Sequence, residues 1–343
     1  MAEKRKRGAR RISLVTGATS VIGRAVVRRL IERGDEVRVV VRQRPDGAAT
    51  WKTLPSGVKP YVAALSESSE ENSRALREAC RGVNTIFHFA SSAQGGGRSL
   101  NQSMQTNVVG TENLLLSFVE ANPDPESRMR IIFSSSTAVY GYSRRGEIIT
   151  EESETKPKTP YGESKLMAEQ VIKAFAAANP RIGYIILRIG VMYGTGYHYG
   201  FEKLFSMLKE GRMRQIGNGE NHLTMVNIDD VVDAVMLASE SRAGSRVYNL
   251  TDGVQYTQKG LLKKASAFLG VEPPSSRVSY LLASLVSRSK GFDSPQFLFL
   301  TSDRIVSIDR ARKELRFSPK RSLDVEGKAM ADEFLKRNKR VHE

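Results

Sequence analysis

The chain of 343 residues is 40% apolar and 26% charged, which is enough to bury a large core and to form one domain with a smaller partner. No apolar run reaches the ~20 residues that a membrane-spanning helix needs, and the N-terminus lacks the apolar stretch of a signal peptide, so we expect a cytoplasmic protein without a membrane span. The single cysteine, Cys80, excludes an intramolecular disulfide and a thiolate metal cluster, and we expect no metal site.

A basic tail begins the chain. Residues 1–11 contain six basic residues and one acid, and they supply +5 of the formal net charge of +16. We interpret residues 1–10 as a disordered, solubilising arm, and we favour this over a nucleic-acid or membrane contact. The remaining positive charge is compatible with phosphate-bearing ligands.

The first apolar run, Ile12 to Thr16, predicts a buried strand, and an amphipathic helix follows through Arg33. Between them lies a loop that begins at Gly17 and ends at Gly23. Glycines at a turn between a strand and a helix let backbone amides approach a pyrophosphate at the helix N-terminus. This first unit therefore predicts a dinucleotide site.

The second strand, 36–41, ends next to Arg42. In units of this kind that bind NAD, an acidic residue at the end of the second strand usually accepts hydrogen bonds from the ribose hydroxyls. Here Val41 occupies that position. An arginine beside it suits the 2′-phosphate of NADP. We therefore favour NADP as the cofactor, with NAD as the alternative.

Three residues in the middle of the chain carry the chemistry that we predict. An apolar run, 131–133, predicts a strand, and the hydroxyls of 134–137 follow at its carboxyl end. Tyr161 and Lys165 are four residues apart at the start of a helical segment, so they share one face. The ammonium of Lys165 would favour the phenolate of Tyr161, and the Ser136 hydroxyl would bind the reacting oxygen.

Two longer stretches give these residues a context. The run 133–141 (FSSSTAVYG), the interval of 25 residues from Ser136 to Tyr161, and the run 160–170 (PYGESKLMAEQ) resemble the extended short-chain dehydrogenase/reductase family. They are most similar to its epimerase branch, in particular the UDP-galactose 4-epimerases. The resemblance covers roughly residues 11–335. It implies an α/β fold: a Rossmann-type, doubly wound parallel sheet with a smaller, discontinuous substrate domain.

The resemblance also implies how the chain is divided. Residues 11–192 would form the dinucleotide-binding domain, and residues 216–256 would return to its sheet. The substrate-binding domain would consist of residues 193–215 and 257–335. Helices at the dimer-interface positions of the family imply a homodimer.

Several cofactor contacts follow from the resemblance alone. Ser20 stands where the family pattern TGxxGxxG has its middle glycine, and no aspartate follows the third strand, 58–65, to hold the adenine. His88 would be a packed histidine, and Asn107 would hold a water that links Lys165 to solvent, with a purely structural role as the alternative. The implied cofactor contacts are Gly17, Ser20, Val21, Ile22, Gly23, Arg42, Leu65, Ala90, Ser91, Tyr161, Lys165 and Gly190.

Departures from the pattern decide which substrate we expect. Val191 replaces an asparagine, and Phe297 an arginine, that contact the phosphates of nucleotide sugars in the epimerases; Arg304 could substitute. Burying a phosphate without hydrogen-bond donors is strongly unfavourable. The absence of this asparagine and this arginine therefore argues for a small-molecule substrate without phosphates. The segments 280–286 and 295–300 would form an apolar pocket wall, as in the hydroxysteroid and dihydroflavonol reductase branches, although ordinary core packing stays open.

Three functions remain open. The first is an NAD(P)-dependent reductase or dehydrogenase of a ketone or secondary alcohol with Ser136, Tyr161, Lys165 and Asn107 as its catalytic residues. The second is a nucleotide-sugar 4-epimerase that holds its NAD tightly and uses the same residues. The third is a non-catalytic protein that binds dinucleotides or RNA, which only the basic charge suggests. Ala138 stands where dehydratases carry an acidic residue, so we exclude an elimination.

Overall fold

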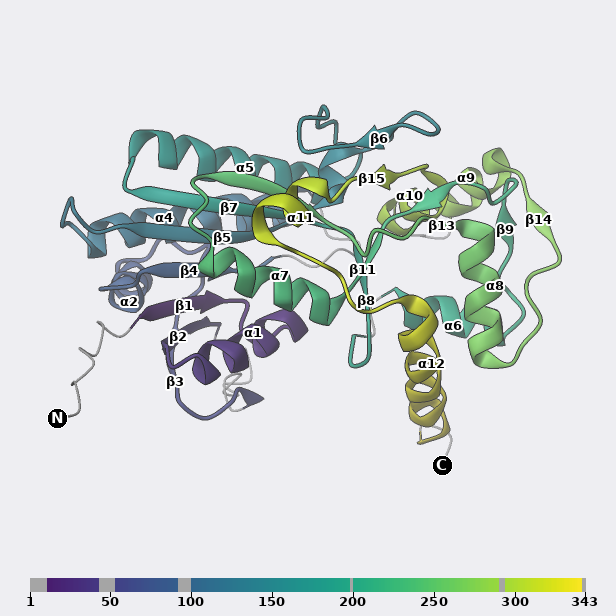
Figure 1. Cartoon of the computed structure of the whole chain (residues 1–343), viewed down its shortest axis with the longest axis horizontal. Coiled ribbons are helices and arrows are strands. Elements are labelled where there is room, and N and C mark those ends of the chain that lie inside the picture. The colour runs from purple at the N-terminus through teal and green to yellow at the C-terminus, as the bar shows by residue number, and fades with distance from the viewer. Residues whose placement is uncertain (1–10, 43–52, 92–99, 198–199, 290–293, 341–343) are drawn as a thin grey trace.

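The centre of the protein is a seven-stranded sheet in which all strands are parallel (Figure 1). The computed structural model describes residues 11–42, 53–91, 100–197, 200–289 and 294–340. The strand order reverses between β1 and β4, which is where open α/β sheets bind ligands. The predicted Rossmann-type, doubly wound sheet is therefore confirmed. Across the sheet the strands are β12 (Arg246–Leu250), β7 (Ile182–Ile189), β5 (Met129–Ser136), β4 (Thr85–His88), β1 (Ile12–Thr16), β2 (Glu36–Val41) and β3 (Val58–Val62).

Helices cover both faces of this sheet because its residues alternate between two apolar cores. Leu14 and Ile131 lie in one core, and their neighbours Val15 and Ile132 lie in the other. Each such side chain, once fully buried, contributes about 1.5–3 kcal/mol to folding. The core of Val15 also holds residues of α1 (Val21–Glu32), α7 (Ile228–Glu240) and α11 (Asp309–Leu315), and the core of Leu14 holds residues of α2 (Glu70–Cys80), α4 (Gly110–Ala121) and α5 (Pro160–Ala178).

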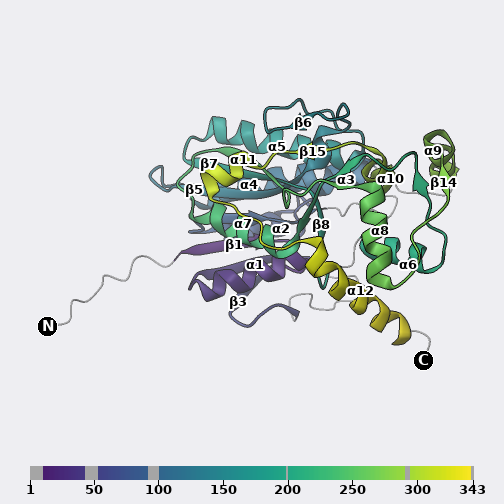
Figure 2. The same cartoon turned by 45° about the vertical axis from the view of Figure 1, so that its right-hand side comes forward.

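A smaller unit stands beyond the carboxyl ends of the strands, and Figure 2 shows its helices grouped to one side of the sheet. Its apolar core joins α6 (Phe201–Lys209), α8 (Gln258–Leu269) and α12 (Leu323–Arg340). Four short strand pairs and two helices lie outside the main sheet. The pairs are β6 (Ile148–Ile149) with β15 (Ile305–Val306), β8 (Val191–Tyr193) with β11 (Met225–Asn227), β9 (Gln215–Ile216) with β14 (Arg277–Val278), and β10 (His222–Leu223) with β13 (Tyr256–Thr257); the helices are α9 (Tyr280–Ser289) and α10 (Ser294–Thr301).

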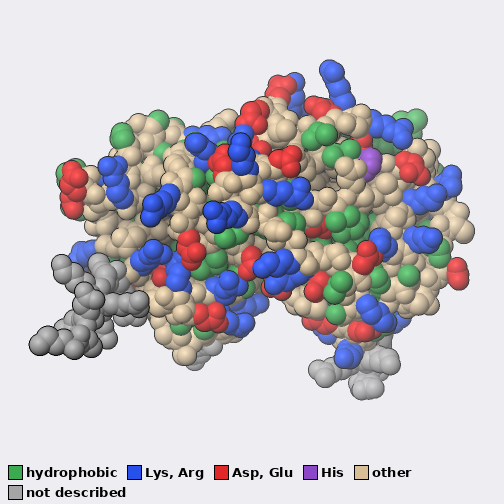
Figure 3. Space-filling model, in the orientation of Figure 1, with side chains coloured by type: hydrophobic (Ala, Val, Ile, Leu, Met, Phe, Trp, Pro, Cys, Tyr) green, Lys and Arg blue, Asp and Glu red, His purple; other side chains and the backbone are tan. Residues whose placement is uncertain are grey.

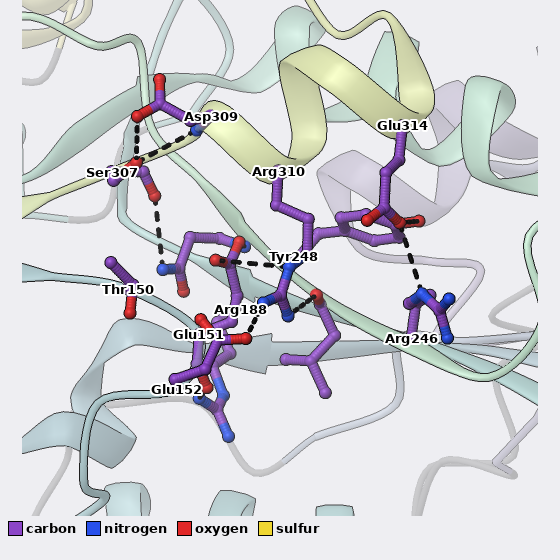
Figure 4. A network of polar contacts seen from close by, with 12 residues as sticks. Thr150, Glu151, Glu152, Arg188, Arg246, Tyr248, Ser307, Asp309, Arg310 and Glu314 are labelled. Carbon is purple, nitrogen blue, oxygen red and sulfur yellow. Dashed lines mark hydrogen bonds and ion pairs between the residues drawn. The ribbon is translucent and has the colours of Figure 1, made fainter.

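One helix within the predicted substrate domain packs against the sheet. Helix α11 falls inside 257–335, but its buried residues Ala311 and Leu315 pack into the core of α1 and α7. Arg310 of the same helix pairs with Glu151 at 3.8 Å, within the polar network of Figure 4. Helix α11 thereby covers apolar residues of β12 and α7 that would otherwise face solvent. The boundaries of the two domains stay a prediction.

The face of the molecule in Figure 3 shows no continuous basic patch among its described residues. On the side that Figure 3 shows, Lys and Arg side chains are scattered among Asp and Glu. The predicted basic tail, residues 1–10, lies outside the described residues. Within the part of the chain that the structure describes, no helix is both long enough and apolar enough to cross a bilayer.

Candidate active site

A cavity of ≈ 340 Å³ opens where β5 and β7 end, between the sheet and the smaller unit. This is within the range of ~300–1,000 Å³ that is usual for small-molecule sites. Its sheet side contains all three residues of the predicted catalytic trio, Ser136, Tyr161 and Lys165. The tertiary structure thus brings together the end of one strand and the start of a helix that lies 25 residues later in the chain.

Local sequence explains how these side chains reach the cavity. Strand β5 ends at Ser136, whose Oγ accepts a hydrogen bond from the Ala138 amide at 3.2 Å and keeps its own proton available for a ligand. Helix α5 begins at Pro160, and the Thr159 Oγ accepts from the Gly162 amide at 3.0 Å. This N-cap contributes about 1 kcal/mol and fixes Tyr161 in the first turn.

Lys165 is the most constrained member of the trio. Its side chain is buried, and its Nζ lies 5.9 Å from the centre of the Tyr161 ring and 4.6 Å from that of Phe133. The ammonium donates a hydrogen bond to the Ser134 carbonyl at 2.7 Å. Burial lowers the pKa of Lys165 to about 7, although the Glu169 carboxylate one turn further along α5 opposes this shift. The lysine therefore titrates close to neutral pH.

A buried ion pair, which the sequence did not reveal, supports this side of the cavity. The fully buried carboxylate of Glu169 accepts from Arg188 Nε at 3.0 Å and from Arg188 Nη2 at 2.8 Å. It also accepts from the Ser135 Oγ at 2.5 Å, which ties α5 to the end of β5. Burial of the Arg188 guanidinium opposes its charge, but the hydrogen bonds and the charge of Glu169 outweigh burial and raise its pKa. Arg188 also donates to the Tyr140 hydroxyl at 2.9 Å.

Asn107 lies behind the helix of Tyr161 and does not line the cavity. It belongs to a π turn, η2 (Gln105–Val109), between α3 (Leu100–Met104) and α4, and π turns often occur at functional sites. Its Nδ2 donates to the Ser164 Oγ at 2.9 Å, and that hydroxyl donates to the Tyr161 carbonyl at 2.9 Å. These contacts give Asn107 a structural tie to the first turn of α5. Its predicted role in holding a water stays a prediction.

His88 is packed between two threonines, as a non-catalytic histidine would be. The Thr111 Oγ1 donates to the Asn107 carbonyl at 2.6 Å, so it accepts from His88 Nε2 at 2.9 Å. The His88 Nδ1 therefore accepts from the Thr16 hydroxyl at 2.6 Å. Burial, reinforced by the charge of Lys165, lowers the pKa of His88 to about 3. The imidazole is neutral at physiological pH and is unsuited to act as a base.

The loop before α1 fits a pyrophosphate. Gly17 has φ 69°, and a Cβ there would lie 2.6 Å from the backbone of Phe89 and Ala90. A Cβ on Gly23 would lie 2.2 Å from the Gly17 carbonyl oxygen, so only glycine allows the loop to fold this closely. The Ser20 Oγ caps α1 by accepting from the Gly23 amide at 3.0 Å. Ser20 therefore replaces the family glycine and uses only one backbone amide of the first turn. The N-terminus of α1 can still bind an anion.

The other predicted cofactor contacts lie in different surroundings. Ser20, Val21, Ile22, Ser91 and Gly190 line the cavity together with Tyr161 and Lys165, whereas the remaining ones do not. Leu65 accepts from the Asn113 side chain at 2.9 Å through its carbonyl, and the Ala90 amide donates to the Thr16 Oγ1 at 3.3 Å. Arg42 follows β2 and is exposed, and the loop after it lies outside the described residues. These assignments, and the preference for NADP, stay predictions.

The substrate end of the cavity is mostly apolar. Phe299 and Leu300 line it, as we expected for the segment 295–300. The expectation for 280–286 is wrong for its described side chains, because Leu281, Leu282 and Leu285 are exposed at the surface. Other apolar lining residues were not identified from the sequence, since their helical spacing is equally typical of core packing: Met192, Tyr197, Phe201, Leu204, Met207, Met213 and Leu261, next to the expected Val191.

Several known reductases and one solved structure with bound NAD are similar to this chain. A ketoreductase of Stigmatella aurantiaca that acts on a 4-hydroxy-2-methyl-3-oxo-4-farnesyl-3,4-dihydroquinoline-1-oxide is 25% identical over 89% of this chain and 91% of its own. A 2-alkyl-3-oxoalkanoate reductase of Stenotrophomonas maltophilia is 25% identical over 79% of each chain. The structure of MoeE5 with UDP-glucose and NAD matches with a TM-score of 0.72 and 25% identity, over 95% of this chain and 99% of MoeE5.

The model of the NAD-dependent epimerase/dehydratase family matches residues 13–251, which include the glycine loop and the whole trio. The predicted likeness to the extended short-chain dehydrogenases/reductases is thereby confirmed, and with it the expectation of an enzyme. The chain belongs to the NAD-dependent epimerase/dehydratase family and is an NAD-dependent oxidoreductase or epimerase.

Proposed function

We propose that this protein is an NAD(P)-dependent reductase that converts a ketone into a secondary alcohol on a largely apolar substrate without phosphates, or runs the reverse reaction. One observation carries the proposal: apart from Lys203 and Arg304, the side chains at the substrate end of the cavity are mostly apolar, whereas the diphosphate of a nucleotide sugar needs several donors. Val191 supports this choice, because it lines the cavity at the position of the family's phosphate-binding asparagine.

The trio has distinct roles in this proposal. The Ser136 hydroxyl donates a hydrogen bond to the substrate carbonyl oxygen and orients it. A bound nicotinamide would supply the hydride for the carbonyl carbon. The Tyr161 hydroxyl gives its proton to the substrate oxygen, which balances the charge that the hydride brings. The Lys165 ammonium, 5.9 Å from the Tyr161 ring, stabilises the resulting phenolate. In the reverse direction the phenolate takes the proton back.

Relatives support a ketone substrate. Both reductases described above act, by their names, on oxo compounds that carry long or branched apolar groups. Their chains align with 89% and 79% of this one. NADP as the cofactor rests on Arg42 next to the end of β2, and NAD stays the alternative.

A nucleotide-sugar 4-epimerase is the second candidate. The same trio could oxidise and re-reduce one carbon of a sugar, and MoeE5, whose structure holds UDP-glucose and NAD, shares the fold over nearly the whole chain. For this function another residue would have to replace the missing phosphate donors. The third candidate, a non-catalytic binding protein, has no support from the site, because such a protein would not need the trio.

The choice can be tested by isothermal titration of NADPH, NADH and UDP-glucose into purified protein that has been checked for bound nucleotide. Tighter binding of NADPH, no response to UDP-glucose, and NADPH oxidation with added ketones such as 3-oxo esters would support the reductase. Tightly held NAD together with binding of UDP-glucose would instead establish the epimerase and overturn our proposal.

The mechanism is tested by Tyr161→Phe, with Tyr61→Phe on β3 as a matched control. Loss of the proton donor should lower kcat by at least ~100-fold while NADPH binding changes little. The control removes a hydroxyl far from the cavity and should leave kcat unchanged. Turnover of Tyr161→Phe at the wild-type rate would disprove the roles assigned to the trio.

Three further expectations remain part of the proposal. A homodimer predicts twice the chain mass of 38.0 kDa in light scattering. A cytoplasmic location predicts that a tagged chain fractionates with cytoplasmic enzymes. The absence of a nucleic-acid partner predicts no retention on heparin. Retention that is lost when residues 1–11 are deleted would instead support the third candidate.

A further inference from the structure

One cation in the cavity has no counter-charge. Arg304, which lies between α10 and β15, lines the cavity, yet its side chain is only 7% exposed. Burial lowers the pKa of Arg304 to about 10, and the neighbouring Tyr142 opposes this only in part. The guanidinium therefore keeps its positive charge at neutral pH in a place that strongly disfavours an isolated charge.

The hydrogen bonds of Arg304 are incomplete. Its Nε donates to the Gly141 carbonyl at 3.1 Å, but its buried Nη2 has no partner among the described residues. The adjacent carboxylate, Asp303, accepts from the His222 Nδ1 at 2.7 Å and from the Gly146 amide at 2.9 Å. No described carboxylate lies within ion-pair distance of Arg304. A guanidinium offers two parallel N–H donors to a carboxylate, so the free edge is suited to an anion.

Arg304 is anchored close along the chain to Ser136, the residue proposed to bind the reacting oxygen. Gly141, which holds its Nε, directly follows the short 3₁₀ turn η3 (Thr137–Tyr140) that Ser136 caps. With a rise of ~2 Å per residue, this turn keeps the two ends within roughly 10 Å of each other. Arg304 and Ser136 both line the cavity, so one substrate could place an anionic group on Arg304 and a carbonyl on Ser136.

From this geometry we infer that Arg304 binds a carboxylate of the substrate, and that the substrate is a keto acid or the corresponding hydroxy acid with an apolar chain. The inference rests on the proposed ketone reduction for the identity of the second group. A single buried cation balances one negative charge, whereas a diphosphate carries more charge and more oxygens. Of the other described cations that line the cavity, Lys165 belongs to the trio and Lys203 already has an interaction of its own. The apolar end of the cavity then receives the rest of the chain.

The site can be tested by binding, without turnover. Octanoate and octan-1-ol have the same chain length, and they are titrated calorimetrically into the wild-type protein and into Arg304→Met. Because Arg304→Met loses a charged hydrogen-bonded pair, the affinity for octanoate should fall roughly 10- to 100-fold, whereas the affinity for octan-1-ol should not change. Arg145→Met, in an exposed loop away from the cavity, is the matched control and should bind both probes like the wild type.

Folding of each variant is checked by thermal melting. Should Arg304→Met fail to fold, Arg304→Lys keeps the charge while losing the planar fork, and it should weaken octanoate but not octan-1-ol. UDP-glucose is the third probe, since a diphosphate is the other anion that could occupy the site.

Three results would overturn the inference: no octanoate binding to the wild type, equal weakening of both probes in the variants, or Arg304-dependent binding of UDP-glucose in place of octanoate. Failure of the proposed reduction is a separate outcome. Octanoate binding that depends on Arg304, in a protein that oxidises no NADPH with any ketone, would keep the carboxylate site and reject the reductase.

Discussion

The buried pair of Glu169 and Arg188 gives the sharpest test of how the site is supported. In Glu169→Gln the carboxylate is lost while the shape of the side chain is kept. Arg188, only 3% exposed, would retain the Tyr140 hydroxyl at 2.9 Å and one acceptor oxygen of the new amide. Removing one partner of a buried pair typically costs ~3–5 kcal/mol, and because the amide still accepts a hydrogen bond we expect the lower end, about 3 kcal/mol.

The same substitution should change the active site. Because the Glu169 carboxylate raises the pKa of Lys165 against the effect of burial, its removal should lower that pKa below about 7. Less of the lysine is then cationic at neutral pH, so the phenolate of Tyr161 loses stabilisation. Activity at pH 7 should fall, and the group that must be protonated for activity should titrate at lower pH.

Urea unfolding and a pH–rate profile measure these two effects. Glu163→Gln, on the exposed side of the same helix, is the control and should change the unfolding free energy by less than ~1 kcal/mol. The double variant Glu169→Gln/Arg188→Met should lose less than the sum of the two single losses, since it leaves no unpaired charge. If Glu169→Gln is as stable as Glu163→Gln, our account of the buried pair is wrong.

Two further predictions concern the glycine loop and a buried acid. In Gly23→Ala the new Cβ would lie 2.2 Å from a backbone oxygen, so calorimetry should show NADPH binding at least ~10-fold more weakly. Gly244→Ala, where a Cβ meets nothing within 4 Å, is the control. Equal NADPH affinity of the two variants would contradict our account of the tight loop. Burial raises the pKa of Asp252 to about 6 from 3.8, so the folded protein holds a proton that the unfolded chain releases, and stability declines as pH rises from about 4 to about 6. The decline in unfolding free energy amounts to about 3 kcal/mol and is measured by urea unfolding at several pH values. Asp252→Asn should abolish it. If the variant and the wild type lose stability in parallel as pH rises, the raised pKa of Asp252 is refuted.

Sequence alone determined the features that depend on local pattern. The apolar runs predicted the strands of the sheet, because strands that are buried on both faces must be apolar at nearly every position. The spacing of Tyr161 and Lys165 fixed their common helical face, and Ser136 stood at the end of a predicted strand. These signals placed the candidate trio and the glycine loop correctly at one edge of the sheet.

Only the tertiary structure decided what surrounds the trio. The cavity wall combines residues from α6, α8 and α10, whose apolar spacing fits a core as well as a pocket, so no pattern along the chain distinguishes the two. Charge pairing is equally invisible in sequence: Glu169 finds its partner 19 residues away, whereas Arg304 meets no described carboxylate at all. Burial and pairing depend on which segments meet in space. For that reason the sequence indicated the candidate residues of the site, and the fold determined which side chains surround them.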